Sequence, residues 1–311
     1  MTRIATLTMN PTIDVSYEVD KMFHTHKMRT RNERYEPGGG GINVARVFTR
    51  LGGEATCAYL SGGATGVALD GLLDRQKLER FRIPIADETR IAAAVLECES
   101  GKEFRFTPPG PDVTEAEWQG VLDCLATLEC EYFVASGSLP PGVPANFYAR
   151  AGAIIRQRDI KFVLDTSGEP LGATIAAGGI HLVKPSLGEM RALTGLPLAS
   201  NEEIGTAAMR LVNDGKAELV AVTMGHQGAL LASARGPSFL PAIEIEARSA
   251  VGAGDSFVAG MLHALGNRQD PVDAFAYGIA AGTAAVMAPG HDLAHPADIE
   301  RFRTAMPPLT Q

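Results

Sequence analysis

Short apolar runs, rich in β-branched residues, alternate along the chain with stretches of helical periodicity. Most of these runs are apolar on both faces, as expected for the buried strands of a parallel sheet. The predicted strands are IATLTM (4–9), ATCAYL (55–60), YFVAS (132–136), KFVLD (161–165), HLVK (181–184) and LVAVT (219–223). Between them lie helical patterns such as residues 42–51, INVARVFTRL. The alternation predicts an α/β fold with a doubly wound, mostly parallel sheet flanked by helices.

Two segments depart from this alternation of strands and helices. Residues 12–36 and about 88–107 alternate polar and apolar positions, and the second contains a turn at ESGK. They predict a small antiparallel sheet inserted into the α/β body as a lid. Ile91, Ala93 and Val95 fall on one side of the alternation, and a small sheet with one apolar face is marginal in water on its own. We therefore expect a homodimer whose interface is the lid.

Composition limits the class of protein. The 311 residues are 45% hydrophobic and 21% charged, which is typical of a globular protein with a sizeable core. No internal repeat appears, so we expect a single domain, 1–311, with the two lid insertions. There is no run of about 18 apolar residues, and the amino terminus does not have the pattern of a signal peptide, which together favour the cytoplasm. The net charge of −8 without a basic block disfavours nucleic acid as a partner.

The cysteines and histidines give little support for a metal site. Cys57, Cys98, Cys124 and Cys130 include no CxxC pair, so reduced structural thiols are the favoured interpretation. The His24-x-His26 and His291-x-x-x-His295 pairs lack a third ligand nearby, and Pro296 argues against the second pair.

Four consecutive glycines precede the helical pattern at 42–51 in GGGGINVARVFTRLGG, residues 38–53. Each glycine loses more backbone freedom on folding than any other residue, so such a run is costly. We interpret Gly38 to Gly41 as a bare stretch of backbone against which a phosphorylated sugar can lie.

A second glycine-rich segment is SAVGAGDSFVAGMLHAL, residues 249–265, in which helical periodicity begins at about Asp255. Gly252, Ala253 and Gly254 would form the turn that feeds the helix, whose amino end favours anions. Taken alone, Asp255 is better explained as an ordinary acid at a helix start. An acid beside an anion-binding turn is, however, what phosphoryl transfer to an alcohol requires. The P-loop pattern GxxxxGK[ST] is absent, and GAGDSF lacks the third glycine of a dinucleotide fingerprint.

Five segments occur in an order that resembles one enzyme family. They are GGGGINVARVFTRLGG, SGSLPPGV (136–143), LVKPSLGE (182–189), VTMGHQGAL (222–230) and SAVGAGDSF (249–257). Together they resemble the ribokinase, or PfkB, family of carbohydrate kinases over essentially the whole chain. The run EPGGGGINVAR is most similar to the branch of minor bacterial 6-phosphofructokinases. The resemblance implies a ribokinase-like fold and ATP-dependent phosphorylation of a sugar phosphate, fructose 6-phosphate at C1.

The resemblance also implies roles for residues on the sugar side. Asp255 matches the base that acts on the acceptor hydroxyl, and the 252–254 turn matches the anion hole for the transferred phosphoryl group. Asp14 matches the acid that holds sugar hydroxyls, and Gly38, Gly39 and Asn43 match the sugar-binding segment. The residues that match contacts to the phosphate of the sugar are Lys27, from a neighbouring subunit, Arg90, Arg105 and Ser138.

On the nucleotide side, Lys184 matches a contact to the ATP phosphates, and Thr223, Gly225 and Gly228 match the loop around the nucleotide. Glu189 matches the acid that organises Mg²⁺ through water. Ser186 stands where the family usually has asparagine, which puts metal affinity in doubt. The residues that match the family's potassium loop are Ser249, Val251, Ala285, Ala288 and Gly290. Asp292 is an unusual acid beside that loop.

Three alternatives remain open from the sequence. Two keep the chemistry and change the sugar to tagatose 6-phosphate, or to fructose 1-phosphate phosphorylated at C6. The third is a non-catalytic sensor of sugar phosphate or nucleotide on the same scaffold. The intact Asp255 and its glycine turn argue against the sensor.

Overall fold

The computed structural model describes residues 2–76, 78–245, 251–288 and 292–306. In this part of the chain nine strands form one sheet, in the order β13-β12-β11-β10-β9-β8-β1-β4-β5. All neighbours are parallel except at β11–β12 and β12–β13. The strands are β1 (Arg3–Thr8), β4 (Glu54–Gly62), β5 (Glu79–Ile85), β8 (Tyr132–Ser136), β9 (Lys161–Asp165), β10 (Ile180–Val183), β11 (Ala217–Thr223), β12 (Ala229–Ser233) and β13 (Gly236–Leu240).

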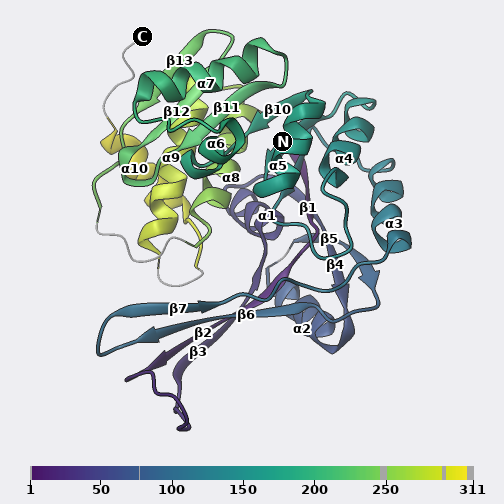
Figure 1. The fold of residues 1–311 in the computed structure, drawn as a ribbon, viewed down its shortest axis with the longest axis vertical. Helices are drawn as coiled ribbons and strands as arrows, with labels where there is room; N and C mark the ends of the chain where they lie inside the picture. The colour runs from purple at the N-terminus through teal and green to yellow at the C-terminus, as the bar shows by residue number, and fades with distance from the viewer. Residues whose placement is uncertain (1, 77, 246–250, 289–291, 307–311) are drawn as a thin grey trace.

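Helices cover both faces of this sheet, giving three layers (Figure 1). One hydrophobic core lies beneath α1 (Gly40–Arg50), α2 (Gly63–Asp74), α8 (Ala253–Gly266), α9 (Pro271–Met287) and α10 (Pro296–Ala305). The other lies beneath α3 (Glu115–Leu125), α4 (Phe147–Arg156), α5 (Gly168–Ala177), α6 (Leu187–Thr194) and α7 (Asn201–Asn213). Buried strand residues alternate between the two cores, as Leu219 and Val220 do in β11. The predicted doubly wound α/β fold is confirmed.

The order of the strands also locates a crevice. From β1 the chain passes to β4 and β5 on one side, and then returns to β8 and the following strands on the other side. Ligands of doubly wound sheets bind outside the carboxyl ends of the strands at such a reversal. The carboxyl end of β1 is therefore where a site is expected.

The lid is a separate sheet in the order β3-β2-β6-β7, built from β2 (Thr12–Val19), β3 (Arg31–Gly38), β6 (Arg90–Glu97) and β7 (Lys102–Phe106). It projects from the body beside α2 (Figure 1). The expectation of an antiparallel sheet is wrong for its central pair, because β2 and β6 are parallel. The reason is that β2 continues from β1 and β6 from β5, two strands that run in the same direction in the main sheet.

The register gives the lid two chemically different faces. The polar lid face carries Asp14, Ser16, Arg90 and Arg105. The apolar lid face carries Val15, Tyr35, Ile91, Val95 and Phe106, of which Tyr35, Ile91 and Phe106 are 50%, 45% and 53% exposed. The predicted grouping of Ile91, Ala93 and Val95 on one face is confirmed by the register.

Candidate active site

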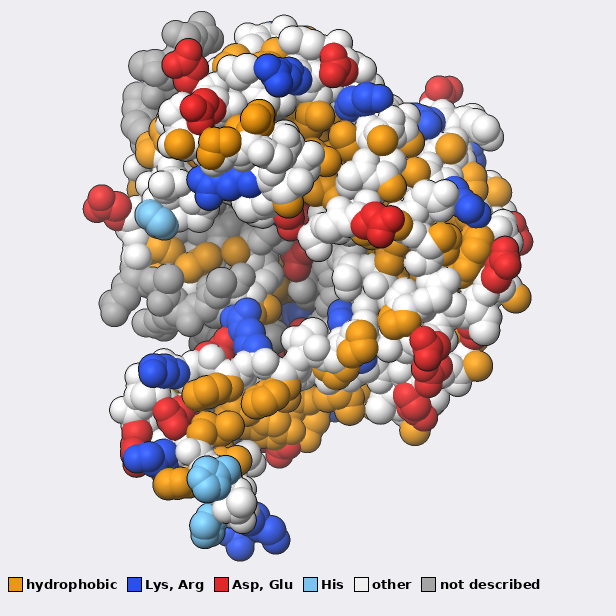
Figure 2. Space-filling model, viewed as in Figure 1, with side chains coloured by type: hydrophobic (Ala, Val, Ile, Leu, Met, Phe, Trp, Pro, Cys, Tyr) orange, Lys and Arg blue, Asp and Glu red, His pale blue; other side chains and the backbone are white. Residues whose placement is uncertain are grey.

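The carboxyl ends of the central strands bring polar side chains to one edge of the main sheet. Ser136 ends β8, Asp165 ends β9, Lys184 follows β10 and Thr223 ends β11. Figure 2 shows a hollow between this part of the body and the lid, with acidic and basic side chains gathered around it. The candidate active site lies at this hollow.

Asp255 lies in the first turn of α8, and Gly252, which precedes the helix, has a left-handed φ of 68°. Its Oδ2 accepts a hydrogen bond of 2.9 Å from Nδ2 of Asn43 in α1. Burial raises the pKa of Asp255 to about 7, and the carboxyls of Asp165 and Asp14 add to the rise, while Asn43 and Lys184 oppose it. A carboxyl that titrates near neutral pH can act as a general base under physiological conditions.

Lys184 provides a positive charge next to Asp165 and the first turn of α8. It is buried, and its Nζ lies 3.1 Å from Oδ1 of Asp165. A Cβ on Gly254 would lie 3.1 Å from the same Nζ, so the ammonium group sits against the first turn of α8. Burial alone would lower the pKa of Lys184, but the carboxyls of Asp165, Glu189 and Asp255 raise it overall. Lys184 therefore keeps its positive charge beside the amino end of α8, where an anion would also be favoured.

The glycine run is packed against other parts of the protein. An added Cβ would lie 2.0 Å from Asp14 Oδ2 at Gly38, 2.6 Å from Thr8 Cγ2 at Gly39, 2.2 Å from Ser136 Oγ at Gly40 and 2.6 Å from Thr8 Oγ1 at Gly41. At Gly39 the φ of 116° adds a conformational reason for glycine. The structure thus gives a reason for the run that the sequence did not: it lets α1 start in contact with β1, β2 and β8. The contact at Gly38 places the Asp14 carboxylate against the beginning of α1.

Arg90 starts β6 and points across the base of the lid. Its Nη2 donates to the backbone oxygen of Asn10 over 2.8 Å, and its Nη1 donates to that of Pro108 over 3.0 Å. Burial lowers the pKa of Arg90, and Asp14 opposes this shift. Ser138 belongs to the same neighbourhood, because its Oγ lies 3.2 Å from Nδ2 of Asn10. Arg90 and Ser138 therefore come together, joined through Asn10, a residue that the sequence reasoning missed.

The other two predicted phosphate contacts are exposed. Arg105 lies on the polar lid face, where its Nε forms a 2.5 Å ion pair with Glu103 of the same strand. Lys27 lies in the exposed loop between β2 and β3, which forms the outer tip of the lid (Figure 1). This position leaves Lys27 accessible to a second copy of the chain.

The predicted nucleotide residues surround the start of α6. Ser186 and Glu189 form a capping box, in which Ser186 Oγ accepts from the Glu189 amide and Glu189 Oε2 accepts from the Ser186 amide. Ser186 also bridges to Thr223, whose amide donates to Pro185. Gly225 begins a 3₁₀ turn, η1 (Gly225–Gln227), and Gly228 follows it with a φ of 104°.

The potassium residues are described only in part. Val251 lies just before α8, and Ala285 and Ala288 lie at the end of α9, where the Ala288 amide donates to the Ala285 oxygen. Ser249 and Gly290 lie outside the described residues. The unusual Asp292 pairs with Arg50 at 3.5 Å and with His295 at 3.0 Å.

No group of three potential His, Cys, Asp or Glu metal ligands occurs among the described residues. All four cysteines are free. Within the same ranges, no helix is both long and apolar enough to cross a bilayer.

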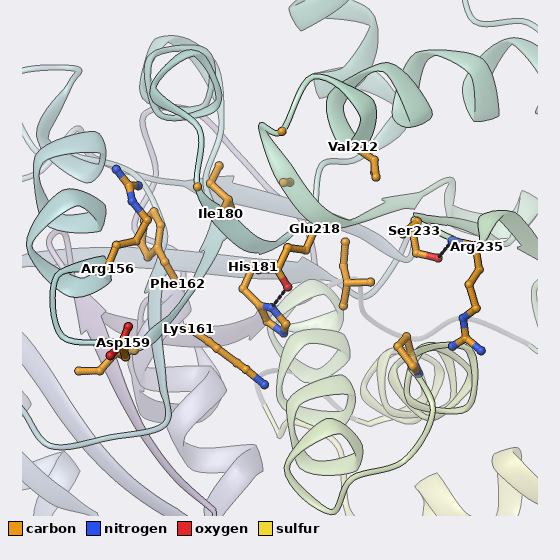
Figure 3. Close-up of a pocket in the computed structure, with 17 residues that line it drawn as sticks. Arg156, Asp159, Lys161, Phe162, Ile180, His181, Val212, Glu218, Ser233 and Arg235 are labelled. Carbon is orange, nitrogen blue, oxygen red and sulfur yellow. Dashed lines mark hydrogen bonds and ion pairs between the residues drawn. The ribbon is translucent and has the colours of Figure 1, made fainter.

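A surface pocket of about 780 Å³ lies at the opposite edge of the sheet, beside the amino ends of β9, β10 and β11. Figure 3 shows Arg156, Lys161 and Arg235 spaced around it, with His181 hydrogen-bonded to Glu218 near its centre. The three cations already have partners, namely the Gly178 oxygen for Arg156, the Tyr132 hydroxyl for Lys161 and the Asp270 carboxylate for Arg235. Their donors do not converge, which distinguishes this pocket from the hollow at α8.

Comparison with known proteins gives a consistent result. Residues 6–298 match the model of the pfkB family of carbohydrate kinases. An ATP-dependent 6-phosphofructokinase isozyme 2 of Mycobacterium tuberculosis is 42% identical over 302 residues, covering 96% of this chain and 88% of that protein. A 1-phosphofructokinase of Borreliella burgdorferi is 30% identical over 286 residues, covering 91% and 92% of the two chains.

The fold is likewise that of solved kinases. A crystal structure of Escherichia coli phosphofructokinase-2 in complex with potassium has a TM-score of 0.93 and 35% identity, covering 98% of this chain and 99% of that one. The E. coli enzyme has also been solved with fructose-6-phosphate and in a tetrameric inhibited form. Arabidopsis thaliana ribokinase shares the fold with a TM-score of 0.77 at 17% identity. The predicted ribokinase-like fold is confirmed.

Proposed function

Because the chain belongs to the pfkB family of carbohydrate kinases, and is thus an ATP-dependent sugar kinase, we propose that its acceptor is fructose 6-phosphate. The C1 hydroxyl oxygen attacks the γ-phosphorus of ATP and loses its proton to Asp255. The bond from phosphorus to the bridging oxygen of ADP breaks, giving fructose 1,6-bisphosphate and ADP. The relative from M. tuberculosis, which is named an ATP-dependent 6-phosphofructokinase, supports this acceptor.

The observation that carries the proposal is the position of the Asp255 carboxyl. It combines a pKa of about 7 with a hydrogen bond from Asn43 and a place in the first turn of a 14-residue helix. A plain helix-start acid would be solvated and would keep an ordinary pKa. The acid instead lies among buried groups that adjust its proton affinity, as is common for catalytic acids and bases.

The amino end of α8 and Lys184 supply positive charge for the transferred group. Backbone amides at Gly252, Ala253 and Gly254 are unpaired within the helix, as at any helix start. Together with the helix dipole they favour the charge on the phosphoryl oxygens in the transition state. Lys184 stays charged close to the same turn, so it is suited to contact the phosphates of ATP.

On the sugar side, Asp14 is placed against Gly38 and interacts electrostatically with both Asp255 and Arg90. This supports a role for Asp14 near the proposed base and the proposed phosphate contact, where it would accept hydrogen bonds from sugar hydroxyls. Arg90 and Ser138 would bind the 6-phosphate, with Arg105 further along the polar lid face. Lys27 would join them from a second copy.

The residues at α6 fit a hydrated magnesium ion bound mainly through ATP. Glu189 uses Oε2 in the helix cap, and its other oxygen remains available to a metal-bound water. Mg²⁺ usually keeps several waters and takes few protein ligands when it binds with phosphates. When bound, it neutralises phosphate charge during transfer. Ser186 uses its Oγ to cap α6. Potassium would be held near Val251, Ala285 and Ala288.

Replacement of the base tests the proposal. We expect Asp255→Asn to lower kcat by roughly 10²–10⁴-fold, measured as ADP release with fructose 6-phosphate, while sugar binding persists. Asp270→Asn is the control, since Asp270 caps α9 and is partly exposed at the opposite edge of the sheet. Near-normal turnover of Asp255→Asn would refute the assigned base. Absence of ADP release from the wild-type chain with every sugar phosphate would instead favour a sensor.

Relatives named 1-phosphofructokinase keep a second acceptor in consideration. Comparison of kcat/KM for fructose 6-phosphate, fructose 1-phosphate, tagatose 6-phosphate and fructose separates the candidates. The proposed function requires the highest value for fructose 6-phosphate. A higher value for fructose 1-phosphate would establish the alternative.

We also propose a homodimer formed through the apolar lid face. Apolar side chains gather on the lid in Figure 2, and the exposed members include Tyr35, Ile91 and Phe106. Burial of this face against a second copy would stabilise the dimer by removing apolar surface from water. A monomer by light scattering at micromolar concentration would contradict the proposal.

A further inference from the structure

We propose that Asn10 is a positioning residue that sets the geometry of the sugar-phosphate end of the site, an inference that rests on the proposed function. It concerns how Arg90 and Ser138 are held before any substrate arrives. Asn10 directly follows β1 and is only 3% exposed. At the end of β1 it lies against three other segments: the start of β6, the loop after β7 and the loop after β8.

Asn10 makes contacts in all three directions. Its Nδ2 donates to the backbone oxygen of Pro109 over 2.8 Å and to Oγ of Ser138 over 3.2 Å. Its own backbone oxygen accepts from Nη2 of Arg90 over 2.8 Å. One residue therefore holds both of the groups that are placed to bind the phosphate.

The loop after β7 is shaped to accept the Asn10 side chain. A Cβ on Gly110 would lie 2.3 Å from Asn10 Oδ1, and the φ of Gly110 is +114°. Pro108, two residues earlier, supplies the second backbone oxygen for Arg90, at 3.0 Å. The amide of Asn10 and the guanidinium of Arg90 thus fix the same loop from two sides.

An arginine held in this way has donors left for a ligand. Nη1 and Nη2 each carry a second N–H beyond the one that they give to a backbone oxygen. Nε is buried and has no hydrogen-bond partner among the described residues, so a nearby anion would also offset the cost of this unpaired charged group. A phosphate oxygen is the natural acceptor for a guanidinium, because Arg binds phosphate through several N–H groups at fixed angles. The orientation of the Arg90 guanidinium plane is set by the two backbone oxygens that it contacts, one of which belongs to Asn10.

Asn10→Ala tests the inference through the balance of kinetic constants. The change removes the hydrogen bonds to Pro109 and Ser138. The backbone oxygen of residue 10 would still accept from Arg90, but the side chain would no longer hold the neighbouring loops in place. We expect the KM for fructose 6-phosphate to rise about tenfold, equivalent to ~1.4 kcal/mol, with kcat and the KM for ATP changed by less than about twofold. The inhibition constant of inorganic phosphate, competing with the sugar phosphate, should rise by a similar factor.

A second readout compares substrates with and without the phosphate. The preference of kcat/KM for fructose 6-phosphate over fructose should fall in Asn10→Ala, because only the phosphorylated sugar uses the group that Asn10 positions. Asn213→Ala is the matched control, since Asn213 is exposed at the end of α7. The control should keep the wild-type preference.

A double-mutant cycle covers the case in which Asn10→Ala folds poorly. Asn10→Leu keeps the approximate size and shape of the side chain but removes the donor to Ser138. Combined with Ser138→Ala, it should show a clearly non-additive effect on the KM for the sugar phosphate, because the two residues share one hydrogen bond. Additive effects would show that the contact does not matter for binding.

The inference is overturned if Asn10→Ala keeps the wild-type KM and substrate preference. It is also overturned if the variant only loses thermal stability and active fraction, with both KM values unchanged, because Asn10 would then merely join loops. These outcomes differ from failure of the proposed function, in which the wild-type chain itself would phosphorylate no sugar phosphate. If the wild-type acceptor proves to be another sugar phosphate, the same comparison is made with that sugar.

Discussion

Removal of the Asn43 side chain should change the pH dependence of catalysis in a defined direction. Nδ2 of Asn43 donates to Oδ2 of Asp255 over 2.9 Å, and this bond favours the ionised carboxylate and so lowers its pKa. Asn43→Ala should therefore raise the pKa of Asp255. A base with a higher pKa is protonated over more of the neutral range, so activity at low pH falls first.

The magnitude follows from the strength of the bond. A hydrogen bond to a charged group contributes ~1.5–3 kcal/mol, and one pKa unit corresponds to about 1.4 kcal/mol, so the pKa should rise by roughly 1–2 units. The starting value is about 7. At pH 7 the ionised fraction would then fall from about one half to about one tenth or less, a loss of roughly fivefold or more.

The assay is kcat/KM for fructose 6-phosphate across pH at saturating ATP, because its acid limb reports the pKa of the base in the enzyme form that binds the sugar. Asn43→Ala should move the midpoint of that limb to higher pH, with partial recovery of activity in alkaline buffer. Asn267→Ala, at the opposite end of α8, should leave the midpoint unchanged. An equal loss of activity at every pH would refute the reasoning, since Asn43 would then act only on sugar binding or Asp255 would not be the titrating base.

Three further predictions use other parts of the structure. Asp165→Asn removes a carboxyl that raises the pKa of Asp255, so the acid limb of the same profile should move to lower pH; a shift upward would contradict the electrostatic account. Gly53→Ala places a Cβ 2.0 Å from Cε1 of Phe48 and should lower the free energy of unfolding in urea by ~1–3 kcal/mol. Gly120→Ala in α3 meets nothing within 4 Å, and should raise the same quantity by about 0.5–1 kcal/mol. Phe106→Lys on the apolar lid face should weaken the proposed dimer in light scattering, whereas Val67→Lys, also exposed but on α2, should not; equal effects would argue against the lid as the interface.

The main sheet could be predicted largely because its central strands are short, apolar and bounded by polar residues. The predictions for 132–136 and 161–165 agree with β8 and β9 at both ends. The strand β5, ERFRIPI, was not predicted, because its charged residues and Pro84 hide its apolar face and it lies at the sheet edge. The edge strands β12 and β13 were also not predicted, since short apolar runs cannot be assigned to strand or helix by periodicity alone.

Pairing between distant segments is the part of the lid that the sequence could not reveal. Alternation identified both lid segments and their apolar face, but alternation is the same for parallel and antiparallel neighbours. The site shows the same limit. Asp165 could have been found, because it ends a strand beside the one that leads to Lys184. Asn10 could not, because its partners Pro109 and Ser138 are about a hundred residues away.

The order of the strands places the lid and the other residues of the candidate site in different parts of the chain. Every lid strand lies before residue 107, whereas Asp165, Lys184 and α8 all come later. Under the proposed function, the lid strands would supply most contacts to the acceptor and the later residues would act mainly on the donor, while Ser138 and Asp255 would reach the acceptor from the later part of the chain. A chimera that exchanges both lid segments for those of a kinase with another acceptor should therefore inherit the new acceptor while keeping its donor. Substitutions in the amino-terminal third of such a chain could therefore change the acceptor without altering the residues that act on the donor.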